Sequence, residues 1–98
     1  MSYDISIGKL DINYTGNVAK MWDEAMPMLN LRDMHGKIGI VCLPHLLQGI
    51  QNMLEYPDKY REMNPENEWG DYEGATLVLV KLAVHCELHP YREVFVSK

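Results

Sequence analysis

The sequence has few of the residues that catalysis and cofactor binding usually require. Its three serines, Ser2, Ser6 and Ser97, lie near the two ends, and no G-x-S-x-G nucleophile motif occurs. The phosphate-binding patterns G-x-x-x-x-G-K-S/T and G-x-G-x-x-G are also absent. His85 and Cys86 are adjacent, but neighbouring residues of a helix point about 100° apart, which does not suit a nucleophile and its base. We therefore expect a protein that is not an enzyme and that binds no cofactor.

Basic residues are also scarce. Lys and Arg total 9 against 14 Asp and Glu, which gives a net charge of −5. Broad binding to nucleic acid depends on neutralising phosphates, so we expect no direct nucleic-acid binding. No apolar run approaches the ~18 residues of a membrane span, and the first residues do not form a basic and apolar leader. The expected location is the cytoplasm, without membrane contact, where Cys42 and Cys86 stay reduced.

What is present is typical of a small globular protein. The 98 residues are 47% hydrophobic and 23% charged, without low-complexity tracts or internal repeats. That length predicts a single domain over residues 1–98. A domain of this size buries a modest core, so association into a homo-oligomer is compatible with the composition.

The first half contains one amphipathic helix followed by a loop. Apolar side chains recur every three or four residues over residues 18–26, after a capping residue at Thr15 or Asn17. Pro27 ends this helix. Residues 30–39 mix charges with two glycines and predict a connecting loop.

The second half contains two further helices. The first shows amphipathic spacing over residues 43–54, with Pro44 in its first turn and Pro57 beyond its end. The second covers residues 73–88, is apolar nearly all round and has Asp71 as a natural cap. Because apolar side chains surround it, we expect this helix in the centre of the domain.

Extended segments are predicted at both ends. Residues 3–14 alternate in polarity, with a kink or turn at Gly8, and Val94 and Val96 alternate near the C-terminus. If these segments pair, the fold class is α+β, with about three main helices beside a small antiparallel sheet formed by the N- and C-terminal segments.

A repeated C-x-x-H spacing is the strongest metal candidate. Four such ligands would satisfy a tetrahedral zinc ion in a small structural module. Bulky leucines between the ligands, and the absence of a glycine-rich knuckle, favour instead two core cysteines and two surface histidines, and so no bound metal. The four residues are Cys42, His45, Cys86 and His89.

Two segments combine amide and aromatic side chains at predicted helix starts: NYTGN at residues 13–17 and NPENEWGDY at residues 64–72. Helix starts offer free amide donors, asparagine both donates and accepts, and aromatic rings stack on planar groups. If the two starts lie together, they form a pocket for a nucleotide-like or sugar-like molecule. The residues expected to bind a ligand or partner are Asn13, Tyr14, Thr15, Asn17, Asn64, Asn67, Trp69, Asp71 and Tyr72.

The same residues have a purely structural interpretation. Trp69 could fold back over the core while the asparagines cap helices and form turns. The carboxylates of Glu66, Glu68, Asp71 and Glu73 could hold a hard cation, although their spacing does not fit a calcium loop and favours a solvated segment.

Nearly the whole chain resembles a loosely related group of small proteins of unknown function encoded by bacteriophages and prophages. The resemblance rests on YDISIG, NYTGN, GKIGIVCLPHLL, NPENEWGDYEGA and CELHPYREVFVS. The similar proteins more often have glycine where this chain has Glu68, and glycine adopts backbone angles that glutamate resists.

The resemblance implies a phage or prophage accessory protein that counters host defence in the host cytoplasm by binding. The preferred hypothesis is sequestration of a small nucleotide-derived immune signal. The alternative is inhibition of a host defence protein, such as a CRISPR complex, through the acidic surface, and a zinc-binding structural module is more remote.

Overall fold

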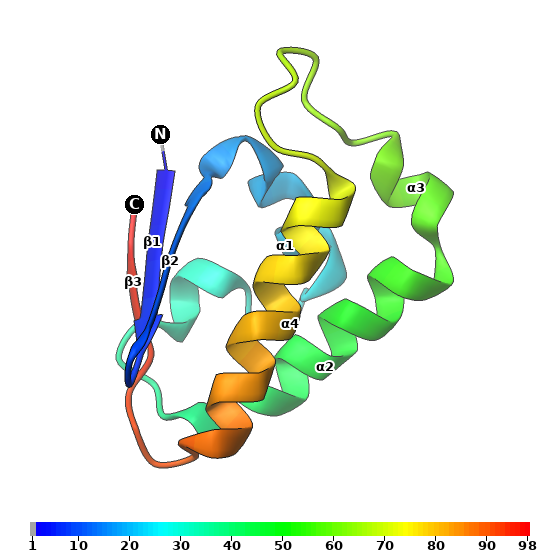
Figure 1. Cartoon of the computed structure of the whole chain (residues 1–98). Coiled ribbons are helices and arrows are strands. Elements are labelled where there is room, and N and C mark those ends of the chain that lie inside the picture. Colours follow the sequence, from blue (N-terminus) through cyan, green and yellow to red (C-terminus); the bar gives the residue numbers. More distant parts are fainter. Residues whose placement is uncertain (1) are drawn as a thin grey trace.

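Two N-terminal strands form a hairpin at one side of the computed structural model, which describes residues 2–98 (Figure 1). Strand β1 (Ser2–Ile7) turns at Gly8 and Lys9 and pairs antiparallel with β2 (Leu10–Thr15). The alternation of β1 buries Tyr3, Ile5 and Ile7, whereas Asp4 is exposed and Ser6 is half-buried. The turn expected at Gly8 is confirmed.

The C-terminal strand completes the sheet. Strand β3 (Phe95–Ser97) pairs antiparallel with β1, so the sheet order is β2-β1-β3 and the two chain ends lie side by side (Figure 1). Val96 of β3 is buried between two exposed neighbours. The predicted α+β fold, with a sheet made of N- and C-terminal segments and three helices of seven or more residues, is confirmed.

The first predicted helix begins as a short 3₁₀ turn. Thr15 caps η1 (Gly16–Val18) by accepting a hydrogen bond from the Asn17 backbone N–H, and α1 (Ala19–Ala25) follows directly. The expected loop at residues 30–39 is only partly irregular. It contains η2 (Leu31–Met34), which buries Leu31 and Met34 in the core.

Helix α2 (Gly39–Glu55) starts earlier than the sequence predicted. Pro44 therefore lies inside the helix and not in its first turn, so that expectation is wrong. Proline has no backbone N–H to donate to the carbonyl four residues earlier, which here belongs to Ile40. Because Ile40 is half exposed to water, the proline is tolerated inside the helix. Pro57 does follow α2, and it begins the short helix α3 (Pro57–Arg61).

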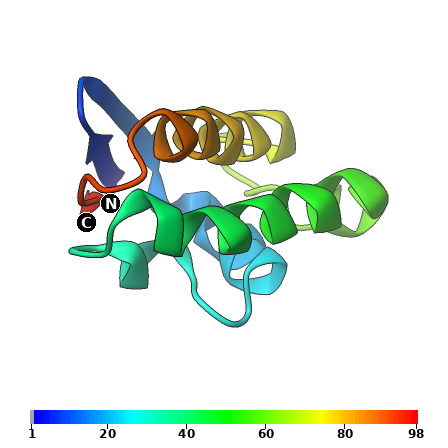
Figure 2. The ribbon, with the colours of Figure 1, turned by 90° about the horizontal axis from the view of Figure 1, so that it is seen from below.

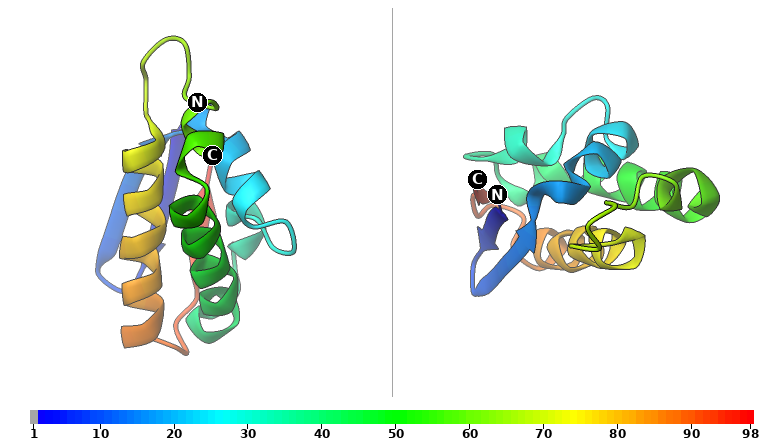
Figure 3. Two further views of the ribbon diagram at one scale, coloured as in Figure 1. Left: turned by 90° about the vertical axis from the view of Figure 1, so that its right-hand side faces the viewer. Right: turned by 90° about the horizontal axis from the view of Figure 1, so that it is seen from above.

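Helix α4 (Tyr72–Leu88) begins one residue before the predicted range 73–88, ends where predicted, and runs beside α2 in the opposite direction (Figure 3). Asp71 caps it, because its Oδ1 accepts a hydrogen bond of 2.7 Å from the Gly74 backbone N–H. Gly39 allows the two helices to come close, since a Cβ there would stand 3.1 Å from the Cα of Cys86.

The sheet lies at one side of the helices, and α1 lies behind α2 in the view of Figure 2. The largest buried side chain is Trp22, whose indole N–H donates to the carbonyl of Ala75 at 3.1 Å. Its ring meets Tyr3 edge to face at 5.2 Å. Within residues 2–98, no helix is long and apolar enough to cross a membrane.

One expectation about α4 is wrong. The helix is not buried on all sides, because Leu77, Val84 and Leu88 are each about half exposed or more. Figure 3 shows why: the side of α4 and α2 that faces away from the sheet has no further layer over it.

Candidate functional site

The most polar segment of the chain is an ordered loop, residues 64–71, which we call the Trp69 loop. It joins α3 to α4 and projects beyond the helices (Figure 1). The backbone N–H of Glu68 donates to the carbonyl of Pro65, and that of Trp69 donates to Oδ1 of Asn67 at 3.0 Å. The loop is therefore fixed by its own hydrogen bonds.

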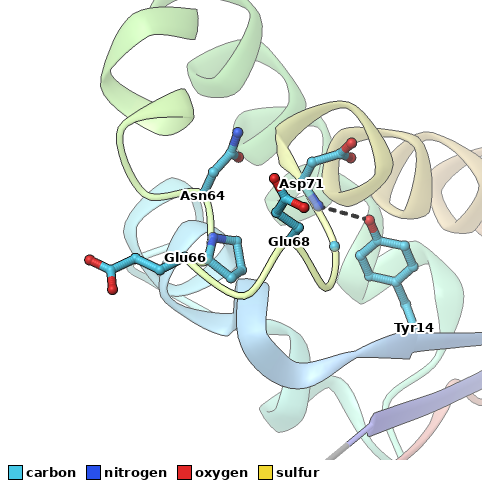
Figure 4. Close-up of a pocket in the computed structure, with 7 residues that line it drawn as sticks. Tyr14, Asn64, Glu66, Glu68 and Asp71 are labelled. Carbon is cyan, nitrogen blue, oxygen red and sulfur yellow. Dashed lines mark hydrogen bonds between the residues drawn. The ribbon is translucent and has the colours of Figure 1, made fainter.

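Contacts with the end of β2 hold the loop in place. Gly70, with a φ of +87°, lies so close to Thr15 that any Cβ at this position would clash with its methyl group. The backbone N–H of Asp71 donates to the hydroxyl of Tyr14 at 3.2 Å (Figure 4). The two polar segments singled out in the sequence, residues 13–17 and 64–72, therefore lie together in the fold.

Trp69 does not cover the core. Its side chain is 70% exposed, so the interpretation of this tryptophan as a lid is wrong. It borders a depression of about 380 Å³ that is also lined by Ser2, Asn13, Thr15 and Asn17. Within residues 2–98, its indole N–H donates no hydrogen bond, in contrast to that of Trp22.

Several of the predicted binding residues have structural roles. Oδ1 of Asn64 accepts from the backbone N–H of Tyr72 at 2.9 Å, and Asp71 caps the same helix. Asn13 donates to Oδ1 of Asp4 across the hairpin at 2.6 Å. These hydrogen bonds account for the presence of Asn13, Asn64 and Asp71 at these positions without a role in ligand binding.

The two tyrosines are less accessible than the sequence suggested. Tyr72 is only 5% exposed, and its hydroxyl donates to the carbonyl of Met53 at 2.6 Å, so its ring is not available to a ligand. Tyr14 is half-buried and packs against the core, with its ring 6.2 Å from that of Trp22. Its hydroxyl accepts from the Asp71 backbone N–H, and the edge of its ring lies against Gly70.

A second depression is also bordered by the Trp69 loop, and it is acidic. Its volume is about 610 Å³, and Glu66, Glu68 and Asp71 are among its lining residues. Figure 4 shows Glu66 pointing outward, away from Tyr14, while Glu68 and Asp71 lie on the side of Tyr14. No lysine or arginine of residues 2–98 lines either depression.

The paired C-x-x-H residues do not form a metal site. Cys42 and Cys86 are buried, and burial raises the pKa of Cys42 to about 11 and that of Cys86 to about 12. His45 borders a separate depression beside Met28, whereas His89 lies against the hairpin turn at Gly8. Within residues 2–98, no three His, Cys, Asp or Glu side chains are placed to hold a metal ion.

Some residues of the site were not expected from the sequence. Ser2 borders the Trp69 depression because β1 pairs Ser2 with Thr15, a register that alternation alone does not reveal. Pro65 and Gly70 line the acidic depression, and their positions in the same short segment as Trp69 are the only sequence signal for them.

Comparison of the chain with models of protein families, with curated proteins and with solved structures finds no match in any of the three.

Proposed function

We propose that this chain is a non-catalytic binding protein that engages a basic surface on another protein through the Trp69 loop. The observation that carries the proposal is the exposure of Trp69, 70%, on a loop whose Asn64 and Asn67 side chains accept hydrogen bonds from the backbone. Tryptophan is among the residues that contribute most to binding at protein interfaces. An exposed tryptophan on an ordered loop is a suitable anchor for a partner.

The order of the loop supports tight binding. A flexible loop must lose conformational freedom when it binds, which weakens the complex. Here the hydrogen bonds accepted by Asn67 and Asn64, and the contact of Gly70 with Thr15, already fix the backbone before any partner arrives. Most of the interaction energy of Trp69 is therefore available for affinity.

Charge favours a basic protein over an anionic ligand. Glu66, Glu68 and Asp71 lie on the same loop as Trp69, and the whole chain carries a net charge of −5. Complementary charges steer association and exclude wrong partners. The positively charged channel that holds the nucleic acid in a CRISPR effector is a surface of the required kind.

The biological setting comes from the resemblance to small phage and prophage proteins. We place the chain in the host cytoplasm, where it counters host defence by covering the basic surface of a defence protein. A surface that normally binds nucleic acid is a natural target for an acidic protein.

Sequestration of a nucleotide-derived signal is the second candidate. Its support is the depression beside Trp69, where Asn13, Thr15 and Asn17 offer uncharged polar groups next to a ring that can stack on a base. Phosphate groups would meet no lysine or arginine there, which is why we rank this function second.

The test begins with phage plating on hosts that each carry one defence system. Expression of the wild-type chain should restore plating in a host whose defence protein it inhibits. The Trp69→Ala variant should fail to restore it, because the anchor is lost. Tyr91→Ala is the matched control, since Tyr91 is 77% exposed but lies beyond the opposite end of α4.

Binding to the purified defence protein then separates the two candidates. Trp69→Ala should raise the dissociation constant by about 30-fold, the effect of losing an interface hot spot of ~2 kcal/mol. Higher salt should slow association. A nucleotide panel that raises the melting temperature of the wild type but not of Trp69→Ala would favour the second candidate. Equal activity of wild type and Trp69→Ala in plating and binding would overturn both.

A further inference from the structure

An apolar groove lies between α2 and α4. Figure 3 shows these two helices side by side, on the side of the molecule that faces away from the sheet. Its volume is about 500 Å³, and seven of its eight lining residues are apolar. Glu87 is the only charged one. The groove is separate from the Trp69 loop, none of whose residues line it.

The apolar face extends beyond the groove along both helices. Leu47 and Leu54 are separated by two turns of α2, and Leu77 and Val84 are spaced in the same way on α4. Helices on the surface of a monomer normally carry charged side chains on the solvent side. The exposed apolar side chains of this face, 47% to 63% accessible, are Ile40, Leu47, Leu54, Leu77, Val84 and Leu88.

We propose that a second copy of this chain covers the face, so that α2 and α4 of two copies form a four-helix interface. The proposal does not depend on the function of the Trp69 loop. The two helices run antiparallel in one layer, and two such layers can pack face to face about a twofold axis.

Charge makes the face compatible with a copy of itself. Helix α2 has no Asp, Glu, Lys or Arg between Gly39 and Leu54. With the twofold axis parallel to the helices, α4 of each copy lies on the uncharged α2 of the other, so Lys81 and Glu87 meet no like charge. The rest of a chain with a net charge of −5 repels its copy, which leaves this face as the favoured contact.

The same arrangement gives Glu87 a favourable position. Within one chain, Gly39 at the start of α2 lies against Cys86, next to Glu87. Rotation about a twofold axis parallel to the helices leaves the height of each residue along that axis unchanged. Each Glu87 therefore lies near the first turn of α2 of the second copy. A carboxylate is stabilised at a helix start by the helix dipole.

The exposed area is sufficient for a dimer. Burying one such side chain completely removes on the order of 100 Å² of apolar surface, so six half-exposed ones present roughly 300 Å² per copy. Two copies and a polar rim then bury about 1,000 Å² in total, which is the size that a specific interface needs.

The test is the oligomeric state of the purified chain, measured by sedimentation velocity and native mass spectrometry over a concentration series. The wild type should be a dimer. Val84→Glu places a charge in the centre of the face and should raise the dimer dissociation constant at least about 100-fold. Met28→Glu is the matched control, because it adds the same charge at an 84% exposed residue outside the face and should leave the dimer intact.

Circular dichroism checks that both variants are folded. A wild type that stays monomeric at all concentrations would overturn the proposal, as would a dimer that persists in Val84→Glu. Equal dissociation of Val84→Glu and Met28→Glu would assign the effect to net charge and would also overturn it. A monomeric wild type whose plating activity is lost in Val84→Glu would assign the groove to a host partner instead.

Discussion

Glu68 holds an unusual backbone conformation for a residue with a side chain. Its φ is +61°, whereas the other positive φ angles in residues 2–98 belong to glycines. The left-handed region costs a residue with a Cβ about 1 kcal/mol, because the Cβ approaches the following carbonyl oxygen. The resemblance had already indicated an unusual backbone at this position, since the similar proteins more often have glycine there.

Glu68→Gly should therefore stabilise the protein. Relief of the backbone strain outweighs the greater freedom of glycine in the unfolded chain, and the net gain should be about 0.5 kcal/mol in the free energy of unfolding. Urea unfolding measures it. Glu68→Ala removes the same charge but keeps the Cβ, so it should give no gain. Equal gains in both variants would assign the effect to charge and not to the backbone.

The two thiols set a pH dependence of stability. Burial raises the pKa of Cys42 from 9.0 to about 11 and that of Cys86 from 9.0 to about 12. Between pH 9.0 and about 11 the unfolded chain loses these protons while the folded chain keeps them. The free energy of unfolding must therefore fall as pH rises through this window.

Urea unfolding from neutral to alkaline pH should show this fall in the wild type. The double variant Cys42→Ala, Cys86→Ala lacks both thiols, so its stability should decrease less steeply over the same range. A thiol reagent near neutral pH should label the wild type only as fast as the chain unfolds. Rapid labelling of the folded protein would contradict the burial of both thiols.

At the scale of elements, the start of α4 depends on close contact with the hairpin. A Cβ at Gly74 would clash directly with the hydroxyl of Tyr14, the same hydroxyl that accepts from the backbone of Asp71. Gly74 is thus required by its neighbour on β2, although alanine is the better helix residue in isolation.

The effect of Gly74→Ala on the free energy of unfolding should therefore be opposite in the wild type and in a Tyr14→Leu variant. In the wild type it should lower the free energy of unfolding by about 2 kcal/mol, the usual cost of overpacking. In a Tyr14→Leu background the clash is relieved, and the same change should raise stability by about 0.5 kcal/mol through helix propensity. The four proteins form a double-mutant cycle measured by urea unfolding. Equal effects in both backgrounds would contradict the contact.

Local chemistry made much of the fold predictable. Asp71 as a cap, Thr15 at the first helix and the turn at Gly8 follow from short-range hydrogen bonding and backbone geometry, and each is confirmed. Pro44 was misplaced because α2 starts at a glycine that packs on α4, a contact that helix signals do not encode. The 3₁₀ helix η2 was missed because Arg32 and Asp33, between its buried residues Leu31 and Met34, made the segment resemble a loop.

The candidate site was predictable only in part. Clusters of asparagine and aromatic residues identified both segments. The close contact of Gly70 with Thr15, which joins the two segments, depends on tertiary structure and could not be predicted. Composition could not decide whether Trp69 or Tyr72 is buried. The structure buries Tyr72 and exposes Trp69, because Tyr72 is the first residue of α4 and its side chain points to α2.

At the scale of the whole molecule, two surfaces of different chemistry are kept apart. The Trp69 loop is acidic and precedes α4, whereas the apolar face follows the length of α2 and α4 away from the sheet (Figure 3). A dimer through the apolar face would carry two Trp69 loops. Such a dimer would bind a partner with repeated sites more tightly than a single loop, because the second contact forms within one complex.

The pairing of β1 with β3 also bears on how the chain folds during synthesis. The hairpin of β1 and β2 can close as soon as β2 is made, but Asp4 meets Ser97 only after β3 has emerged from the ribosome. Until then β1 has an open edge with the apolar residues Ile5 and Ile7. An unpaired edge of this kind accepts strands from other chains, so the nascent protein is open to misassembly until β3 pairs with β1.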